Sequence, residues 1–486
     1  MIYRLRPYQE DCVKSISDYI NSDRRDPVLI VAPVAAGKSI LIAEAARLMG
    51  DKTLVLQPSR ELLTQNHDKI TSYGIPATIY SASCGKKELS NMIYATLGSI
   101  KKVVGQLKEM GIRNVLIDEA HAGYSPEDGS EFMTFMNELK PRKVIGFTAT
   151  PCRLKNMSIG QTSYSQLNFI TRMRPVYFKN LIHVIQVEEM IRQGFWTPLK
   201  YETWDFNGDA LKLNSNGSEY TAESISEAVR KNGLNNLILR RLMVLKDVCR
   251  SILVFMDSVE SCNTAAEWMN AKICAGMAEV VHGGTPKKQR EAIVERFKSG
   301  KTKVVFNYSA LGTGFDHPGL DCVIVGRPTF SFSSFYQWLG RAVRIKDGKD
   351  SALVVDCCNN SSRFGDIRKL GIENYKGYGW GMFIGDKLIT NIPMGDKVTK
   401  TDLDIKAAKK DRRRGLAQGI TASPVPGRPD HPLGSTVMTF GKYSGWMLHS
   451  IPVSYFKFIN ETFDWDNDRN KEIKEYIDFL IKNNRL

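Results

Sequence analysis

The segment at residues 32–39, Ala-Pro-Val-Ala-Ala-Gly-Lys-Ser, has the residue types that bind nucleotide phosphates. A tight loop before a helix presents backbone N–H groups to phosphates, and Lys38 adds a point charge on the outer ones. The hydroxyl of Ser39 suits a Mg²⁺ ligand. We therefore assign the phosphates to Ala35, Ala36, Gly37, Lys38 and Ser39. Because alanine replaces the usual glycine at position 35, we expect a negative φ at Ala35.

Two adjacent carboxylates follow another apolar run. Asp118 and Glu119 come directly after Val115-Leu116-Ile117, which reads as a buried strand. A magnesium–nucleotide site needs one carboxylate for the metal and one to take a proton from the attacking water. We assign Asp118, together with Ser39, to Mg²⁺, and Glu119 to the role of general base.

A third segment, residues 337–344, supplies two arginines. Arg341 and Arg344 are three residues apart, a spacing that places both on one face of a helix. From there they can reach across a cleft between two lobes and stabilise charge on the terminal phosphate. The catalytic residues that we predict are therefore Lys38, Asp118, Glu119, Arg341 and Arg344.

Alternating strands and helices must position these segments. Apolar runs at residues 27–33, 53–56, 114–117 and 143–147 predict the strands of one lobe. A second set begins at residue 251 and ends with residues 352–356. Such alternation is typical of parallel sheets covered by helices, so we predict an α/β fold with two lobes.

The region between the lobes is basic. Residues 153–179 contain five basic residues and no acidic one, and residues 199–219 carry two Asn-Gly pairs, which predict an inserted β-hairpin. Both are candidates for gripping nucleic acid, and a solvated linker and an ordinary surface hairpin stay open as alternatives. The predicted parts are lobe 1 (1–152), the basic insertion (153–235), lobe 2 (236–370), a basic and proline-rich linker (371–436) and a small C-terminal module (437–486).

Charge and cysteine content restrict the setting. The net charge of +15 favours a polyanionic partner, because phosphate neutralisation releases counterions. Nine scattered cysteines without a Cys-x-x-Cys pair indicate reduced thiols and no structural zinc. We find neither a membrane-spanning apolar run nor a signal-peptide core, so we expect a cytoplasmic protein, in a bacterium or a phage-infected host, without a membrane partner.

In their order along the chain, these motifs resemble those of superfamily 2 helicases with a DEAH-type second Walker motif. The resemblance covers roughly residues 1–356 and implies two RecA-like lobes, with ATP and Mg²⁺ between them and a DNA strand crossing both. Residues 146–153 and 191–199 are similar to RadD-like DNA-repair helicases, and the architecture more loosely resembles UvsW-like phage branch-migration helicases. The chain departs from the RadD-like pattern because it lacks a cysteine-rich zinc segment.

The resemblance also assigns individual residues. It implies that Gln9 contacts adenine and that Gly314 and Asp316 lie beside the nucleotide. It assigns the coupling of hydrolysis to lobe movement to His121, Thr148, Thr150 and Gln337. The DNA contacts that we expect are Arg60, Thr96, Ser99, His282, Thr313, Arg172 and Arg174.

The function that this resemblance implies is ATP-dependent unwinding or branch migration of forked and junction DNA by a monomer. The partners would be single-stranded and branched DNA, in replication, recombination or repair. An RNA helicase, a catalytically weak nucleic-acid clamp and a duplex-DNA translocase subunit stay open as alternatives. Residues 440–445 resemble an FGKY-type module, for which a DNA-contacting role and a packing role are both open.

Overall fold

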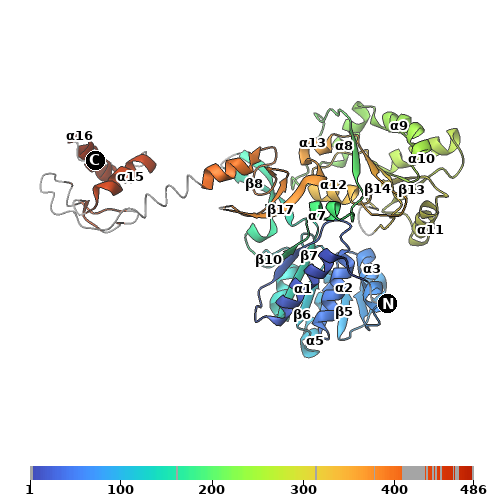
Figure 1. The fold of residues 1–486 in the computed structure, drawn as a ribbon, viewed down its shortest axis with the longest axis horizontal. Helices are drawn as coiled ribbons and strands as arrows, with labels where there is room; N and C mark the ends of the chain where they lie inside the picture. Colours follow the sequence, from blue (N-terminus) through green and yellow to red (C-terminus); the bar gives the residue numbers. More distant parts are fainter. Residues whose placement is uncertain are drawn as a thin grey trace. The chain divides into compact units, whose positions relative to one another are not determined.

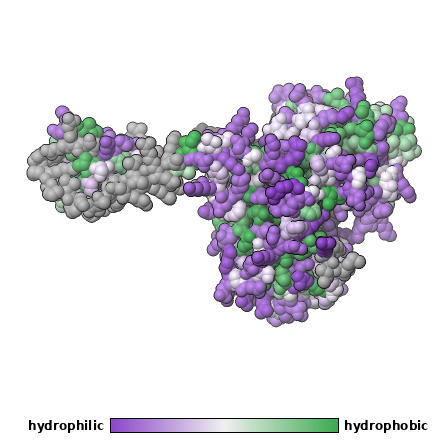
Figure 2. Space-filling model, in the orientation of Figure 1, coloured by the Kyte–Doolittle hydropathy of each residue, from purple (hydrophilic) through white to green (hydrophobic). Residues whose placement is uncertain are grey.

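The structure is a computed structural model that describes residues 4–159, 162–311, 315–376 and 378–407, and parts of residues 433–483. The chain divides into two compact units, residues 1–375 with 379–399, and residues 376–378 with 400–486. Each unit is described by itself. Figure 2 shows hydrophilic side chains over most of the displayed face of the first unit. In the part of the chain that is described, no helix is long and apolar enough to cross a membrane.

Lobe 1 is built on an eight-stranded sheet in the order β10-β1-β7-β6-β2-β5-β3-β4 (Figure 1). Its strand pairs are parallel except for β3 with β4. The central strands are buried along their whole length, as expected for a parallel sheet with helices on both faces. The strands are β1 (Val28–Val31), β2 (Thr53–Leu56), β3 (Thr78–Ser81), β4 (Lys86–Lys87), β5 (Met92–Ala95), β6 (Asn114–Ile117), β7 (Lys143–Thr148) and β10 (Asn180–Val184). The helices are α1 (Pro7–Asn21), α2 (Lys38–Met49), α3 (Arg60–Thr71), α4 (Leu97–Ile100), α5 (Val104–Glu109), α6 (Glu131–Leu139) and α7 (Val187–Arg192).

Lobe 2 is built on a six-stranded parallel sheet in the order β11-β16-β15-β12-β14-β13. The strands are β11 (Leu199–Thr203), β12 (Ile252–Phe255), β13 (Ala278–His282), β14 (Val304–Tyr308), β15 (Cys322–Val325) and β16 (Ala352–Asp356). The helices are α8 (Ala222–Lys231), α9 (Leu234–Val248), α10 (Val259–Lys272), α11 (Lys287–Lys298), α12 (Phe332–Leu339) and α13 (Asn360–Phe364). The predicted fold class, two α/β lobes with parallel sheets, is confirmed.

The β-hairpin predicted at residues 199–219 is confirmed only around its second Asn-Gly pair, residues 216–217, where the chain makes one antiparallel bridge. Strand β11 pairs in parallel with β16, and the loop after it has a single bridge between Leu213 and Tyr220. Apolar side chains of this loop, including Trp204 and Phe206, pack against the core of lobe 2, so the Asn-Gly pairs close a packed loop. The antiparallel hairpin of this region consists of β8 (Cys152–Ile159) and β9 (Thr162–Phe169), immediately after lobe 1's last predicted motif.

Part of the predicted linker is also folded. Residues 370–399 form a four-stranded antiparallel sheet of β17 (Leu370–Tyr375), β18 (Gly379–Ile384), β19 (Lys387–Leu388) and β20 (Val398–Thr399). Basic and proline-rich composition predicted a linker over residues 371–436, but Met382, Phe383 and Leu388 are buried and hold the sheet. The basic and proline-rich residues 408–432 lie outside the described residues.

The second unit contains α15 (Val453–Thr462) and α16 (Lys471–Lys482). Both helices bury one apolar face in a shared cluster that includes Phe456, Ile459, Ile477 and Leu480. Tyr443 of the FGKY-type motif is buried in the same cluster, and the other residues of that motif lie outside the described residues.

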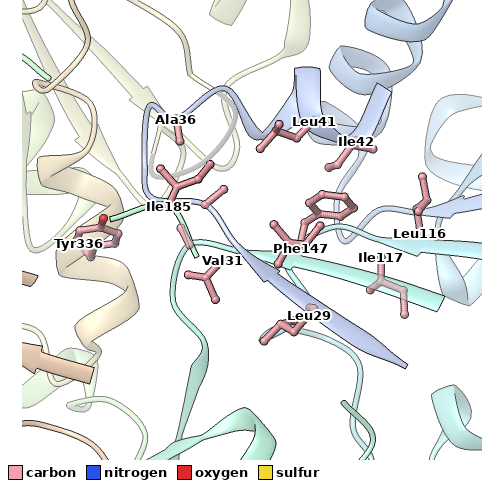
Figure 3. Close-up of a cluster of buried hydrophobic side chains, with 14 of the residues drawn as sticks. Leu29, Val31, Ala36, Leu41, Ile42, Leu116, Ile117, Phe147, Ile185 and Tyr336 are labelled. Atoms are coloured by element: carbon pink, nitrogen blue, oxygen red, sulfur yellow. The ribbon is translucent and has the colours of Figure 1, made fainter. Parts of the chain in front are cut away.

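The loop between β1 and α2 adopts a backbone that the sequence did not suggest. Figure 3 shows Val31 and Ala36 beside Leu41 and Ile42, in the apolar cluster that anchors the loop on both sides. Between these anchors the chain turns sharply, with a φ of +65° at Ala35 and +81° at Gly37. The expected negative φ at Ala35 is therefore wrong. The left-handed conformation costs a residue with a Cβ roughly 1–2 kcal/mol, and here only position 37 has a glycine to avoid it.

Replacing Ala35 with glycine should stabilise lobe 1. The glycine relieves the left-handed strain but adds entropy to the unfolded chain, so we expect a net gain of roughly 0.5–1 kcal/mol in the free energy of unfolding. Denaturant or thermal unfolding of the whole chain measures it. The matched control is Ala36→Gly, since Ala36 is fully buried and outside the left-handed region, and this variant should lose stability. Equal destabilisation by both substitutions would contradict the strain at position 35.

Candidate active site at the lobe interface

A cavity of about 320 Å³ lies between the two lobes and collects most of the predicted nucleotide residues. Lobe 1 contributes the phosphate loop and the two carboxylates, and lobe 2 contributes the segment with two arginines. The predicted residues that line the cavity are Ala35, Gly37, Lys38, Ser39, Asp118, Glu119, Asp316, Gln337, Arg341 and Arg344. Gly314 and Thr313 lie outside the described residues.

The ammonium group of Lys38 is buried between the two carboxylates. It forms ion pairs with Asp118 and, at 2.7 Å, with Oε1 of Glu119. Burial alone would lower the pKa of Lys38, but the two carboxylates outweigh this effect and raise it. One cation thus faces two carboxylates, and the remaining negative charge with the nearby Ser39 hydroxyl suits Mg²⁺, which prefers oxygen ligands.

Asp118 is fixed by a residue that the sequence analysis missed. Its Oδ2 accepts a hydrogen bond from Nδ2 of Asn66 at 3.0 Å, and its Oδ1 accepts one from the backbone N–H of Glu119 at 2.8 Å. Asn66 is buried on α3, where an asparagine in a polar helix gives no pattern that marks it. The hydrogen bond from Asn66 fixes the orientation of the Asp118 carboxylate at the cavity.

Glu119 has the geometry and charge state of a general base. It is buried, with a φ of +46°, and strained backbone of this kind concentrates at functional sites. Burial would raise the pKa of its carboxyl group, but the ammonium group of Lys38 outweighs burial and holds that pKa below its usual value. The carboxylate is therefore ionised at neutral pH and can accept a proton from water.

Two of the predicted coupling residues, His121 and Thr150, contact a single side chain of lobe 2, Ser333 on α12, and a third, Thr148, contacts His121. The Nδ1 of His121 lies 2.8 Å from Oγ1 of Thr148, and its Nε2 lies 3.1 Å from Oγ of Ser333. The same Ser333 oxygen lies 3.0 Å from Oγ1 of Thr150. Burial lowers the pKa of His121, so its ring is neutral and can donate from one nitrogen and accept at the other. Ser333 lies one helical turn before Gln337, which was predicted to be a coupling residue. This spacing is the signal that could have identified Ser333 as a further coupling residue.

The two arginines differ from the prediction in their secondary structure. Helix α12 ends at Leu339, so Arg341 and Arg344 follow the helix and do not share a helical face. A Cβ at Gly340 would lie 2.6 Å from Cβ of Val34, so the helix ends where its backbone meets the phosphate loop. This close approach brings both arginines to the cavity without helical spacing.

The backbone carbonyl of Phe315 holds both guanidinium groups. Arg341 and Arg344 each donate to this oxygen at 2.7 Å, and Arg344 also pairs with Oδ1 of Asp316 at 2.6 Å. Burial, with Arg344 beside it, lowers the pKa of Arg341 to about 9. An anion in the cavity would offset that penalty, which suits a contact with phosphate.

Gln9 lies behind the phosphate loop and outside the cavity lining. Its Nε2 donates to the carbonyl of Ala36 at 2.8 Å, and its Oε1 accepts from the backbone of Arg6 at 2.9 Å. The cavity wall here is formed by Arg6 and Phe195, whose ring centroid lies 4.6 Å from the Arg6 guanidinium carbon. An aromatic face of this kind suits a purine ring. The contact of Gln9 with adenine stays a prediction.

Residues 195–197 clamp the two lobes together. The indole Nε1 of Trp196 donates to the carbonyl of Val34 at 2.9 Å, and Thr197 bonds to the carbonyls of Val343 and Arg344 at 2.8 and 2.7 Å. Tyr336 of α12 also reaches the apolar cluster beside Ile185, as Figure 3 shows. In the sequence this segment carries only a family resemblance, and its structural role depends on contacts with residues far away in the chain.

The residues predicted to contact DNA lie outside the cavity. Thr96 and Ser99 are hydrogen-bonded to each other at 3.1 Å, and the side chain of Arg60 is exposed at the start of α3. Arg172 and Arg174 are exposed after β9, and His282 ends β13. Their contact with DNA stays a prediction.

The hairpin of β8 and β9 is attached to the loop that carries Glu119. The Nη2 of Arg153, on β8, donates to the carbonyls of Ala120 at 3.1 Å and Tyr124 at 2.5 Å. Lys155 pairs with Glu127 of the same loop at 3.3 Å. In the sequence Arg153 is only one cation of a basic segment, but in the structure it positions the loop after Glu119.

Both lobes match known domain families. Residues 2–153 match the family described as type III restriction enzyme, res subunit, and residues 235–346 match the helicase conserved C-terminal domain. The first range contains the phosphate loop and the two carboxylates, and the second range contains the two arginines. The matches support a superfamily 2 helicase.

The chain is similar over about two thirds or more of its length to three proteins. A 51.5 kDa protein of a Lactococcus phage (isolate 7-9) is 25% identical over 332 residues, covering 68% of this chain and 65% of the relative. The DNA 3'-5' translocase XPB2 of Sulfurisphaera tokodaii is 24% identical over 380 residues (72% and 80%). The ATP-dependent DNA helicase Hel308 of Pyrococcus horikoshii is 26% identical over 377 residues (69% and 49%). The chain thus spans between half and four fifths of these relatives.

A solved structure supports the fold. The ATP-dependent Type ISP restriction-modification enzyme LlaBIII bound to DNA aligns with a TM-score of 0.53 at 15% identity, covering 89% of this chain and 32% of that one. At this identity the likeness concerns the fold alone, and it agrees with two RecA-like lobes.

Removing the carboxylate of Glu119 should separate nucleotide binding from hydrolysis in this protein. Because Glu119→Gln keeps the shape of the side chain but cannot take a proton from water, we expect ATP hydrolysis to fall by about 10²–10⁴-fold with ATP binding retained. Steady-state ATPase rates and fluorescent-nucleotide binding measure the two effects. Wild-type turnover in this variant would remove Glu119 as the base.

Loss of the Ser333 hydroxyl should weaken the contact between the lobes. Ser333→Ala removes hydrogen bonds to His121 and Thr150, each worth about 0.5–1.5 kcal/mol, so we expect a roughly 5- to 150-fold lower nucleic-acid-stimulated ATPase rate. Ser362→Ala, on α13 of the same lobe, is the matched control, since the Ser362 hydroxyl is exposed and bonds only to the nearby Asn359 among the contacts described. If both variants were equally active, Ser333 would not be part of the coupling path.

Proposed function

We propose that this chain is an ATP-dependent DNA motor that unwinds or branch-migrates forked and junction DNA. The observation that carries the proposal is the path from the catalytic carboxylate to the second lobe. Glu119 lies two residues before His121, and His121, Ser333 and Thr150 link the lobes across the nucleotide cavity. A change at the terminal phosphate would alter these contacts and move one lobe against the other, which is the step a translocating motor needs.

The nucleotide would be ATP with Mg²⁺. Lys38 would contact the outer phosphates, Ser39 and Asp118 would hold the metal, and Arg341 and Arg344 would neutralise charge that develops in the transition state. Bound Mg²⁺ supplies charge neutralisation at the phosphates. Glu119 would orient the attacking water and take its proton.

A pocket at the carboxyl edge of the lobe 2 sheet supports a nucleic-acid path. It measures about 320 Å³ and is lined by Asn307, Ser309, Arg327 and Trp338, among others. The Arg327 guanidinium carbon lies 5.7 Å from the Trp338 ring centroid, and Nδ2 of Asn307 is buried without a hydrogen-bond partner. A cation, an aromatic ring and a free donor are the groups that single strands contact. This edge is also where parallel sheets bind ligands.

DNA is favoured over RNA by the names of the relatives. XPB2 is named a DNA 3'-5' translocase and Hel308 a DNA helicase, and by this likeness we propose 3′ to 5′ movement. The net charge of +15 suits either nucleic acid. We propose that the protein acts as a monomer and that the hairpin of β8 and β9 contacts the junction, since Arg153 joins its base to the Glu119 loop.

A duplex-DNA translocase serving another enzyme is the second candidate. The match of residues 2–153 to the res subunit of type III restriction enzymes favours it. Such a protein would hydrolyse ATP on duplex DNA without separating strands, so its products distinguish it from an unwinding motor.

The deciding experiment is ATP hydrolysis with single-stranded, duplex, forked and four-way DNA and with RNA of matched shape, alongside gel-resolved strand products. We expect the largest stimulation by forked and four-way DNA, with unwound or exchanged strands. Lys38→Ala is the control and should abolish both readouts, because the phosphates lose their cation. Equal stimulation by every DNA without products would favour the duplex translocase, and preferential stimulation by RNA would overturn the DNA assignment.

A further inference from the structure

A separate cavity in lobe 2 is surrounded by cations and takes no part in the site described above. It measures about 370 Å³ and is formed by four loops that each lead toward a strand of the parallel sheet. The loops contain residues 248–251 before β12, 297–300 before β14, 317–321 before β15 and 346–351 before β16. The cavity therefore lies at the amino-terminal edge of the sheet, opposite the edge with Asn307 and Arg327. We call it the basic pocket.

The charge of the basic pocket is unbalanced. Arg250, Lys298, Lys346 and Lys349 line it, against Asp321 and Asp350. The two carboxylate oxygens of Asp321 accept backbone N–H groups of Arg250 at 2.8 Å and Ser251 at 3.0 Å. Within the described part of the chain, no ion pair involves the side chains of Arg250, Lys298 or Lys346. Three cations are thus left facing one cavity.

His317 forms part of the pocket wall and reports this positive potential. It is 5% exposed, and its Nε2 lies 2.9 Å from Oγ of Ser251. Burial and the charges of Lys346, Lys298 and Lys349 lower the pKa of its ring to about 4. The ring is therefore neutral at pH 7, and lysine charges converge on it from two loops.

The basic pocket and the nucleotide cavity share a wall. Alternate residues of one segment face the two cavities. Asp316 and Pro318 line the nucleotide cavity, and His317 and Gly319 line the basic pocket. A Cβ at Gly319 would lie 3.0 Å from Nζ of Lys346, so this glycine lets the lysine lie against the wall.

Lys349 connects the same pocket to the arginine segment. Its Nζ donates to the carbonyls of Ala342 at 2.7 Å and Arg344 at 2.8 Å. The pocket therefore contacts the backbone that carries Arg344, although it opens elsewhere on lobe 2.

We propose that the basic pocket is a second phosphate-binding site, separate from the nucleotide cavity. Three unpaired cations around a cavity large enough for a phosphate suit a compact anion with several acceptor oxygens. The phosphate group belongs either to a nucleic-acid backbone or to free phosphate, which offer the same oxygens. The backbone case rests on the proposed motor function, and the free-phosphate case does not.

A charge-removal variant tests the pocket. Arg250, Lys298 and Lys346 are replaced together by glutamine, and the matched control replaces Arg240, Lys272 and Lys288, which are exposed cations of the same lobe. Both variants lose three positive charges. Binding of labelled duplex and forked DNA is measured over a range of salt concentrations. If the pocket holds backbone phosphates, the slope of log K against log salt should fall by about 2–3 in the pocket variant and stay near the wild-type value in the control.

The free-phosphate arm uses inorganic phosphate as the probe. In a Lys38→Ala background, which removes the lysine of the nucleotide cavity, the unfolding temperature is followed as phosphate is added. A shift that the pocket variant loses and the control keeps, with unchanged DNA binding, would assign the pocket to free phosphate. If the pocket variant matches the control in both arms, the proposal is overturned. Failure of the wild type to bind any DNA would contradict the motor function, and the phosphate arm would then decide the pocket by itself.

Discussion

The ammonium group of Lys38, buried between Asp118 and Glu119, is the interaction on which the arrangement of the lobe interface depends. Taking three charged groups out of water is costly unless each has partners, and removing one partner of a buried pair typically costs about 3–5 kcal/mol. The surrounding structure supplies those partners. Asn66 binds the second oxygen of Asp118, and His121 lies beside Glu119. A phosphate group entering beside Lys38 would compete for its charge, so nucleotide binding must rearrange this cluster.

Such a rearrangement reaches lobe 2 because the contacts there are short and specific. Gly340 touches Val34 of the phosphate loop, Trp196 holds the carbonyl of the same residue, and Ser333 bonds to His121. Packed interfaces of this kind shift between discrete arrangements and do not deform smoothly. The arginines follow Gly340 directly, so the segment that approaches the loop also carries the charges that face the nucleotide. The same contacts therefore respond to nucleotide binding and determine how lobe 2 moves.

The sequence was sufficient to predict the residues that chemistry requires, and insufficient for the residues that hold them. Lys38, Asp118 and Glu119 stand at the ends of fully apolar runs, and burial on both sheet faces makes such strands easy to recognise. Ser333 and Asn66 carry no such pattern, because a single serine or asparagine in a helix has many ordinary roles. Their partners come from segments far away in the chain.

The errors in the fold have a common physical origin. Local turn signals predicted a hairpin across residues 199–219, of which only the turn at residues 216–217 is paired, and basic and proline-rich composition predicted a linker after residue 370. In both places apolar side chains, such as Phe206 and Met382, pack against distant parts of the chain and decide the structure. The left-handed φ at Ala35 has a similar explanation, since the buried anchors on either side of the loop fix the turn regardless of the residue within it. Tertiary packing outweighs local preference where the two conflict.

Arg153 extends the interface beyond the nucleotide. Its guanidinium binds two carbonyls of the loop that begins at Glu119, while its own strand is paired with β9 along eight residue pairs. Strand β9 is joined in turn to the sheet of residues 370–399, because Asn391 bonds to the backbone of Leu167 and Phe169. A force on the hairpin would therefore act on the Glu119 loop and on this sheet together. In a DNA motor, that connection would let the strand junction influence the position of the base, so the hairpin would act on hydrolysis as well as on DNA.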